Sequence, residues 1–190
     1  MPDSSIRDFL QAEIQRLGFL LSGITRAAPP PHYATYQKWI EAGLHAGMTY
    51  LAAERALERR ARPALILPEA TAMLVVALPY FNPQAAPASS TGEAAGRVAA
   101  YAWGNDYHDI IPPRLAELLA NLEKFLGRGL HARSYTDTGP LLERDFAQQA
   151  GLGWSGKNTC LISPRHGSYF LLGETLLDVC LLYTSPSPRD

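Results

Sequence analysis

Apolar residues recur at helical spacing in two long segments of the chain, one near its start and one after its middle. Ser4 or Ser5 can cap the first helix, and Gly18 ends it. Pro112 and Pro113 suit the first turn of the second. The apolar stripes are Ile6, Phe9, Leu10, Ile14 and Leu17, and then Leu115, Leu118, Leu119, Leu122, Phe125 and Leu126. Each stripe predicts an amphipathic helix with one face on a core.

Shorter apolar runs predict strands and further helices. The run at residues 73–78 contains Val75 and Val76 and is typical of a buried central strand. Other strands are expected at residues 19–24, 97–103 and 131–136, with a hairpin formed by residues 159–163 and 168–172. Helices are expected at residues 33–44, 47–60 and 141–150, the last stopped by Gly151. Strands and helices alternate without internal repeats, so the class is α/β or α+β.

Three segments lack any apolar periodicity. Residues 28–32 hold three prolines and cannot be helical. Residues 82–96, rich in Pro, Ala, Ser and Gly, are the best candidate for a mobile surface loop. The end of the chain is rich in Ser and Pro, so we expect one domain over residues 1–182 and a disordered tail at residues 183–190.

Composition excludes several functional classes. The 190 residues are 47% hydrophobic and 18% charged with a formal net charge of −1, as in a globular domain without a strong field toward nucleic acid or membrane. Cys160 and Cys180 are too few for a disulfide scaffold or a four-thiolate metal site. The polar start of the chain lacks a signal peptide's features, and no apolar run is long enough to span a bilayer. We therefore expect a soluble, cytoplasmic protein with no membrane partner.

Asp137 is the first candidate for chemistry. It lies at the end of a predicted strand, just before a helix, which is where an α/β fold presents catalytic groups. Thr138, Gly139 and Pro140 after it predict a tight turn, where helical N–H groups favour a carboxylate. The alternative is that Asp137 only caps the helix beginning near Leu141.

A glycine-rich segment, GLGWSGKN at residues 151–158, follows that helix. Its glycines allow close backbone approach to a ligand, and Lys157 and Asn158 can donate hydrogen bonds to amides or phosphate. The segment is not a dinucleotide fingerprint, because its glycines follow a helix and precede a strand. Its glycine-to-lysine spacing also excludes a phosphate-binding P-loop. A helix end with a turn explains it equally well.

Two other segments carry polar clusters. Asp106 and His108 lie among aromatic residues and form a metal pair, an acid–base pair or a capped helix start; the metal pair lacks a third ligand nearby. The spacing of Asp106 and His108 is similar to a histidine motif of some cobalamin enzymes, but Ile111 replaces its glycine, so no histidine ligand to cobalt is expected. The arginine run at residues 59–62 is either a solvated helix end or a binding site for phosphate or carboxamide groups.

Together, these segments resemble the epoxyqueuosine reductase family, over nearly the whole chain as far as Asp178. The matching segments are GMTYL with RRARPALILP, YAWGNDYH, DTGPLLERDFAQQAGLGWSGKNTCLI and FLLGETLLD. The resemblance implies an α+β, nitroreductase-like cobalamin-binding domain akin to that of reductive dehalogenases. It also implies a following ferredoxin-like domain with two 4Fe-4S clusters. Cys160 and Cys180 fall at positions that do not ligate clusters in the family, so we expect an N-terminal fragment that cannot turn over alone.

The resemblance further implies the reduction of epoxyqueuosine to queuosine at the wobble position of tRNA, the last step of queuosine biosynthesis. Asp137 matches the family's proton donor, which needs a raised pKa. The expected cobalamin-lining residues are Arg60, Tyr101, Asp137, Asn158, Leu161 and Leu172. Cobalamin is expected to bind base-off to a monomer that receives electrons from flavodoxin or ferredoxin. The alternatives are another corrinoid-dependent reductase and a non-catalytic cobalamin-binding remnant.

Overall fold

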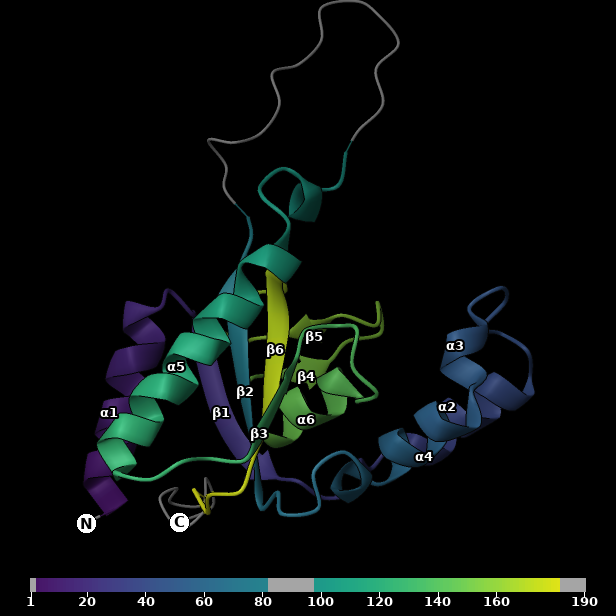
Figure 1. Cartoon of the computed structure of the whole chain (residues 1–190). Helices are drawn as coiled ribbons and strands as arrows, with labels where there is room; N and C mark the ends of the chain where they lie inside the picture. The colour runs from purple at the N-terminus through teal and green to yellow at the C-terminus, as the bar shows by residue number, and fades with distance from the viewer. Residues whose placement is uncertain (1–2, 82–97, 182–190) are drawn as a thin grey trace, which may run out of the picture.

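A four-stranded antiparallel sheet lies at the centre of the structure, a computed structural model that describes residues 3–81 and 98–181 (Figure 1). The strand order is β1-β2-β6-β3, and every neighbouring pair is antiparallel. The strands are β1 (Leu21–Arg26), β2 (Ala72–Pro79), β3 (Ala132–Tyr135) and β6 (Phe170–Leu177). The α+β class is therefore confirmed, and the parallel α/β alternative is wrong.

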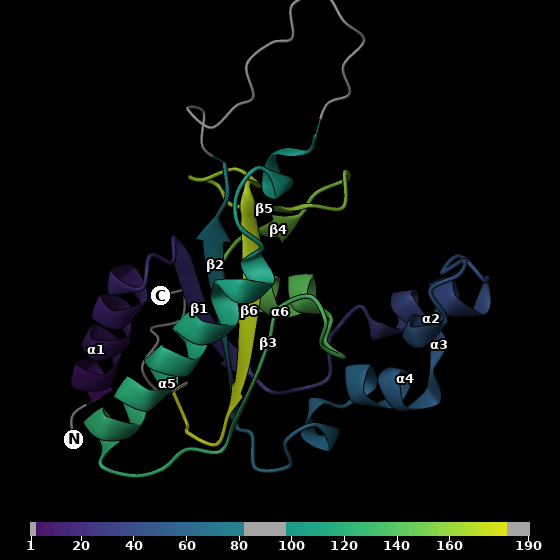
Figure 2. The ribbon, with the colours of Figure 1, turned by 45° about the horizontal axis from the view of Figure 1, so that its top comes forward.

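Helices cover both faces of this sheet. Helices α1 (Asp3–Arg16) and α5 (Ile111–Leu126) lie on one face, and the short helix α6 (Glu143–Gln149) lies on the other (Figures 1 and 2). Side chains of β2 alternate between the two cores, with Leu74 on the α1/α5 side and Val75 on the α6 side. The prediction of a central strand at residues 73–78 is confirmed, because β2 pairs on both edges and is buried along nearly all its length.

The two predicted amphipathic helices are confirmed. Their stripes face each other and the sheet, and the Phe9 and Phe125 rings stack with centroids 4.4 Å apart. Gly18 follows α1 in a left-handed conformation, with φ of 77°. Ser4 and Ser5 lie inside α1, so the expectation that one of them caps the helix is wrong. Within the described ranges, no helix is long and apolar enough to cross a membrane.

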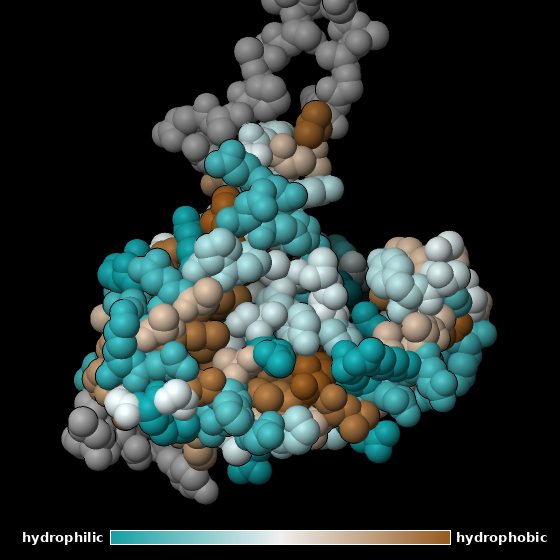
Figure 3. Space-filling view, in the orientation of Figure 1, coloured by the Kyte–Doolittle hydropathy of each residue, from teal (hydrophilic) through white to brown (hydrophobic). Residues whose placement is uncertain are grey.

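Three short helices form a lobe beside the sheet: α2 (Tyr33–Glu41), α3 (Thr49–Ala52) and α4 (Glu54–Ala61). Figures 1, 2 and 3 show this helical lobe standing apart from the layered body. His32 ties it to α6, since its backbone N–H donates to Asp145 over 2.9 Å and its Nδ1 lies 2.8 Å from the same carboxylate. The predicted helices at residues 33–44 and 47–60 are confirmed in shorter pieces.

Two predicted strand features are wrong. Residues 100–102 form one turn of 3₁₀ helix instead of a strand, closed by a 2.9 Å hydrogen bond from Trp103 Nε1 to the Val98 carbonyl. The expected hairpin at residues 159–172 is reduced to one antiparallel bridge between Ser163 and Gly167. Its strands do not pair further, because β5 (Leu161–Ile162) pairs with β4 (Trp154–Ser155) while β6 pairs with β2 and β3. The loop at residues 82–96 and the tail at residues 183–190 lie outside the described residues.

Gly23 provides a test of this packing. A Cβ added there would overlap the carbonyl oxygen of Ala150 just after α6, whereas one added at Gly47 would meet nothing. We expect Gly23→Ala to lower the free energy of unfolding by about 1–3 kcal/mol through overpacking. Gly47→Ala should change it by less than about 0.5 kcal/mol. Urea unfolding of both variants measures this, and equal stabilities would show that β1 and the end of α6 are not in contact.

Candidate active site

Asp137 lies in the turn between β3 and α6. Its backbone is left-handed, with φ of 50°, a conformation in which Asp and Asn are enriched among non-glycine residues. The interpretation of Asp137 as a helix cap is wrong, because the N-cap position of α6 is Leu142 and no side chain caps it. The Asp137 side chain is 51% exposed, so the enclosing walls expected for a proton donor are only partly built by the described residues.

Both carboxylate oxygens of Asp137 are engaged by a segment about thirty residues earlier in the chain. The Tyr107 hydroxyl donates a hydrogen bond to Oδ2, and His108 Nε2 lies 3.3 Å from Oδ1. The other ring nitrogen of His108, Nδ1, lies 2.7 Å from Asp106 Oδ1, which also accepts the His108 backbone N–H over 2.9 Å. Asp106, His108 and Asp137 therefore form a continuous carboxylate–imidazole–carboxylate chain.

This network shifts the protonation of its members. The hydrogen bond to Asp106 raises the pKa of His108, and the contact with Asp137 adds to the rise. Burial, followed by the hydrogen bond to Asp137, raises the pKa of Tyr107, so its hydroxyl remains a donor at physiological pH. Of the hypotheses for Asp106 and His108, the capped helix start is confirmed: Asp106 caps the short 3₁₀ helix Tyr107–Asp109, and its carboxylate also pairs with the His108 imidazole. Within the described residues, no group of three or more His, Cys, Asp or Glu is arranged to hold a metal ion.

Two cavities meet at Asp137 and gather five of the six predicted site residues. One, of about 320 Å³, is lined by Asp137 together with Tyr101, Leu161 and Leu172. The other, of about 600 Å³, is lined by Asp137 and by Arg60 of α4. Asn158 lines neither cavity, and its Oδ1 instead accepts the Cys160 backbone N–H over 3.2 Å. The structure thus does not bring Asn158 together with the other predicted residues.

Arg60 differs from an ordinary surface arginine. Only 7% of it is exposed, and its guanidinium lies over the Tyr36 ring, 5.3 Å from the ring centre. Its Nη1 is buried with no hydrogen-bond partner among the described residues. A buried guanidinium donor normally has an acceptor. Arg60 is therefore suited to bind an amide or anionic group that enters the larger cavity.

The glycine-rich segment at residues 151–158 is explained by local structure. Gly151 ends α6 with φ of 81°, and a Cβ at Gly153 would overlap the Ile162 carbonyl across the β4–β5 pair. The glycines therefore permit close pairing of this chain segment with itself. These glycines can therefore be explained without a ligand close to the backbone.

Sequence reasoning missed three polar residues around Asp137 and a buried carboxyl group in the neighbouring sheet. Glu143 and Arg144 of α6 line the smaller cavity, as does Tyr107. Glu174 is fully buried in β6. A single charged residue inside the run FLLGETLL was the signal for Glu174, because a buried strand rarely holds an unpaired carboxylate.

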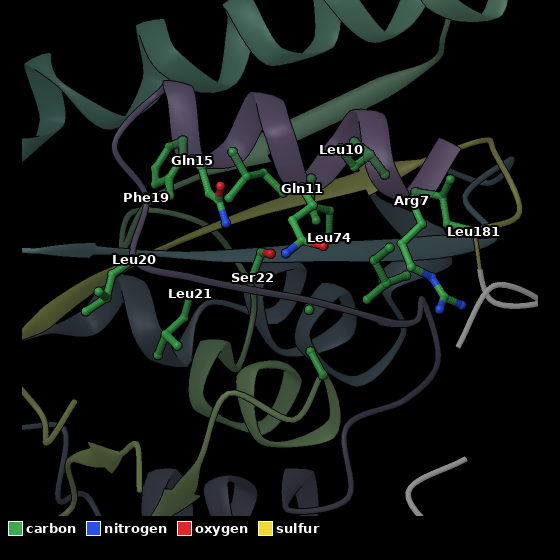
Figure 4. A pocket seen from close by; sticks show the side chains of 14 residues that line it. Arg7, Leu10, Gln11, Gln15, Phe19, Leu20, Leu21, Ser22, Leu74 and Leu181 are labelled. Atoms are coloured by element: carbon green, nitrogen blue, oxygen red, sulfur yellow. The ribbon is translucent and has the colours of Figure 1, made fainter. Parts of the chain in front are cut away.

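A further cavity, of about 440 Å³, lies between α1 and β1 (Figure 4). It is lined mainly by apolar and amide side chains, including Leu10, Gln11 and Leu74, and Arg7 is its one charged lining residue. None of the predicted site residues lines it. It lacks the paired titratable groups found at Asp137, so Asp137 marks the candidate active site.

Comparison with known proteins shows which family this chain is similar to. The model of the family described as "Epoxyqueuosine reductase QueG, DUF1730" matches residues 60–138, a range that includes Arg60, Tyr107, His108 and Asp137. The epoxyqueuosine reductase of Vibrio cholerae is 37% identical over 172 residues, covering 90% of this chain. The resemblance to epoxyqueuosine reductases is confirmed. The chain spans 46% of that relative, and so about half the length of the curated relatives that it matches.

Solved structures of epoxyqueuosine reductases share this fold. The enzyme from Streptococcus thermophilus has a TM-score of 0.77 at 28% identity, covering 98% of this chain and 48% of its own. An epoxyqueuosine reductase solved with an epoxyqueuosine-modified tRNA stem loop has a TM-score of 0.71 at 31% identity, covering 93% of this chain and 46% of its own. A reductive dehalogenase studied for B12-dependent dehalogenation has a TM-score of 0.51 at 20% identity, covering 97% of this chain and 20% of its own; this shows a shared fold.

The carboxylate–imidazole–carboxylate chain predicts how much the pKa of His108 changes when either carboxylate is replaced. Asp106→Asn should lower the pKa of His108 more than Asp137→Asn does, because the Asp106 hydrogen bond is the largest cause of its rise. Asparagine keeps a side-chain oxygen for the His108 backbone N–H, so the short helix should persist. NMR titration of the His108 ring protons measures both values. A larger shift in Asp137→Asn would mean that Asp106 does not hold the imidazole.

Proposed function

We propose that this chain is the cobalamin-binding catalytic part of an epoxyqueuosine reductase, which reduces epoxyqueuosine to queuosine at the wobble position of tRNA. The observation that carries the proposal is the placement of Asp137 where two cavities meet, with Tyr107 and His108 bound to its carboxylate. This constellation lies almost entirely in the segment that the family model matches. The relative solved with a modified tRNA stem loop supports tRNA as the substrate.

The residues around Asp137 suit one side of a corrin. Tyr101, 56% exposed, and Leu172 offer aromatic and apolar surface in the smaller cavity, with buried Leu161 at its wall. Arg60 offers a buried donor without a partner, and the rim of a corrin carries carboxamide acceptors. Bound cobalamin would supply reducing chemistry at cobalt. Asn158 would have to reach the cofactor from outside both cavities.

The overall reaction takes two electrons and two protons and releases the epoxide oxygen as water. An alkoxide is a poor leaving group, so an acid must protonate that oxygen as its bond to carbon breaks. Asp137 is assigned this role. Its carboxylate, once formed, would be stabilised by the Tyr107 hydroxyl and by protonated His108. Because Asp106 raises the pKa of His108, the imidazole is suited to hold the proton that restores Asp137.

Electron delivery to the cofactor is assigned to further parts of a longer protein and to partner proteins. Two 4Fe-4S clusters would relay electrons from flavodoxin or ferredoxin to the cofactor. The protein is proposed to work as a monomer in the cytoplasm, where tRNA is modified.

Asp137→Asn tests the role of Asp137. The substitution is made in a longer form of the protein that spans the full length of its relatives. Asparagine is nearly isosteric and tolerates the left-handed backbone, so fold and cobalamin affinity should be kept. The rate of epoxyqueuosine reduction should fall by about 10²–10⁴, the usual contribution of a positioned general acid. Single-turnover assays on modified tRNA measure it.

Thr138→Ser, a conservative change in the same turn, serves as the matched control and should retain most of the rate. If Asp137→Asn kept a near-normal rate across the pH range, another group would be the donor. Failure of wild-type protein to bind cobalamin or to reduce the modified tRNA would remove the proposed function itself.

A second prediction concerns cobalt ligation. Both ring nitrogens of His108 lie next to carboxylates, Nδ1 at 2.7 Å from Asp106 and Nε2 at 3.3 Å from Asp137, so neither is free for a metal. His108 should therefore not ligate cobalt in bound cobalamin, which the family resemblance leads us to expect in the base-off form. The EPR spectrum of cob(II)alamin bound to His108→Ala should match that of wild type. Nitrogen hyperfine splitting that disappears in this variant would contradict the prediction.

A further inference from the structure

Four aromatic side chains gather at one end of the sheet. Figures 1 and 2 show that the end of β2 and the start of β6 lie together there, next to the 3₁₀ turn at Ala100–Ala102. The Phe81 and Tyr169 ring centres are 4.9 Å apart, and those of Phe81 and Trp103 are 6.5 Å apart. Tyr80 completes this aromatic cluster, with its ring centre 5.8 Å from that of Tyr169.

Backbone hydrogen bonds hold the segments that carry these rings. The Tyr80 N–H donates to the Tyr169 carbonyl over 3.2 Å, which extends the β2–β6 pairing beyond its last register pair, Pro79 and Phe170. The Trp103 indole N–H is fixed by its hydrogen bond to the Val98 carbonyl. The cluster is therefore organised before any partner binds, which lowers the entropic cost of binding.

The outer rings of the cluster are exposed. Phe81 is 48% exposed and Tyr169 is 51% exposed, and neither belongs to the two hydrophobic cores that cover the sheet. Apolar side chains that gather in one exposed patch mark an interaction site. Aromatic rings with an open face stack on planar groups, and every nucleobase offers such a group.

The cluster adjoins the candidate active site. Tyr80 belongs to the cluster and also lines the smaller cavity with Asp137. The Thr136 hydroxyl donates to the Leu172 carbonyl over 2.8 Å, so the neighbouring Asp137 lies level with this part of β6. Tyr169 precedes Leu172 by three residues, roughly 10 Å along an extended strand. A nucleotide whose base reached Asp137 would therefore place the next nucleotides of its strand near the cluster.

The charges of the chain segment that carries Tyr169 favour an anionic partner. Residues 151–172 contain Lys157 and Arg165 and no aspartate or glutamate. Both cations are exposed, and neither forms an ion pair within residues 3–81 and 98–181. Surfaces that bind single-stranded nucleic acid combine such cations, which follow the phosphates, with aromatic rings that stack on the bases.

We propose that the aromatic cluster is a stacking platform for unpaired nucleobases of the tRNA anticodon loop, next to the base that is reduced. A base beside the modified one stacks on the exposed rings of Phe81 and Tyr169, and Lys157 and Arg165 attract the adjoining phosphates. The choice of tRNA rests on the proposed function, whereas the rings and cations by themselves indicate a strand with unpaired bases. Because stacking tolerates any base, the platform holds the loop without reading its sequence.

NMR of the ¹⁵N-labelled 190-residue chain tests whether bases reach the cluster. The probe is a short single-stranded RNA with the sequence of an anticodon loop. The indole N–H signal of Trp103 should shift on titration, whereas that of Trp39, on α2 in the helical lobe, should not. An RNA of the same length with abasic sugars keeps the phosphates but has no stacking faces. It should bind at least about fivefold more weakly, which is the loss of one stacked base.

Substitutions at Tyr169 separate stacking from simple apolar contact. Tyr169→Leu removes the ring from a half-exposed position and should raise the Kd for the RNA about 5–150-fold. Tyr169→Phe keeps the ring and should change the Kd by less than about twofold, since stacking needs only the ring. Leu44→Ala, at a residue 62% exposed between α2 and α3, is the control and should leave the Kd unchanged.

The cations have a separate readout. Arg165→Gln should weaken binding of RNAs of any sequence to a similar extent and reduce the slope of log Kd against log salt concentration by about one. It should leave the ratio between the base-containing and abasic RNAs unchanged, because that ratio reports stacking alone.

An unshifted Trp103 signal, or equal Kd values for Tyr169→Leu and Tyr169→Phe, would overturn the proposal. Equal affinity for the abasic RNA would also overturn it, since the surface would then attract phosphates only. A Trp103 signal that shifts with cobalamin but not with RNA would assign the cluster to the cofactor instead.

These outcomes are distinct from failure of the proposed function. A protein that stacks RNA on the cluster but neither binds cobalamin nor reduces the modified tRNA would keep the platform and lose the enzymatic role. A longer form that reduces epoxyqueuosine equally well with Tyr169→Leu and with the wild-type residue, at RNA concentrations below the Kd, would keep the enzymatic role and lose the platform.

Discussion

The arrangement depends on one strand that has no free side. β6 is paired along both edges, to β2 and to β3, and its two faces are covered by α5 and α6. Gly173 allows α5 to approach closely on one face, because any side chain there would overlap Ile111. The next residue along, Glu174, must then point into the core on the other face. Complete enclosure of β6 thus makes the sheet rigid and buries the Glu174 carboxyl group away from solvent.

The candidate site is built where that sheet ends. The turn after β3 carries Asp137, and the short 3₁₀ helix before α5 carries Tyr107 and His108 to it. Both segments are fixed by elements that cover opposite faces of the sheet, α6 for the turn and α5 for the helix. The carboxylate is therefore held from two independent directions while half of it stays accessible. A proton donor needs this combination, since it must be oriented and must still reach a substrate.

Local patterns predicted the parts of the structure that local forces determine. The stripes of α1 and α5 and the apolar run of β2 were readable because each buries a repeating face. Pairing between distant segments was not readable, so β5 was assigned to β6 although it pairs with β4. In the same way, Asp137 was identified from its own turn, but its contacts with Tyr107 and His108 join residues about thirty positions apart. Asn158 was placed with the site from its donor side chain and from the family resemblance, but its side-chain oxygen instead accepts the Cys160 backbone N–H and closes a turn.

Cys160 gives this site a built-in chemical reporter. Its thiol is free and exposed, and it lines the smaller cavity beside Asp137. Cys180, the other cysteine, is also free and exposed but lines none of the three cavities described above. A molecule that fills the cavity would shield the first thiol from alkylation and leave the second reactive. The rate ratio of the two cysteines thus gives an occupancy measurement with an internal reference, in the unaltered sequence and without any spectroscopic signal from the ligand.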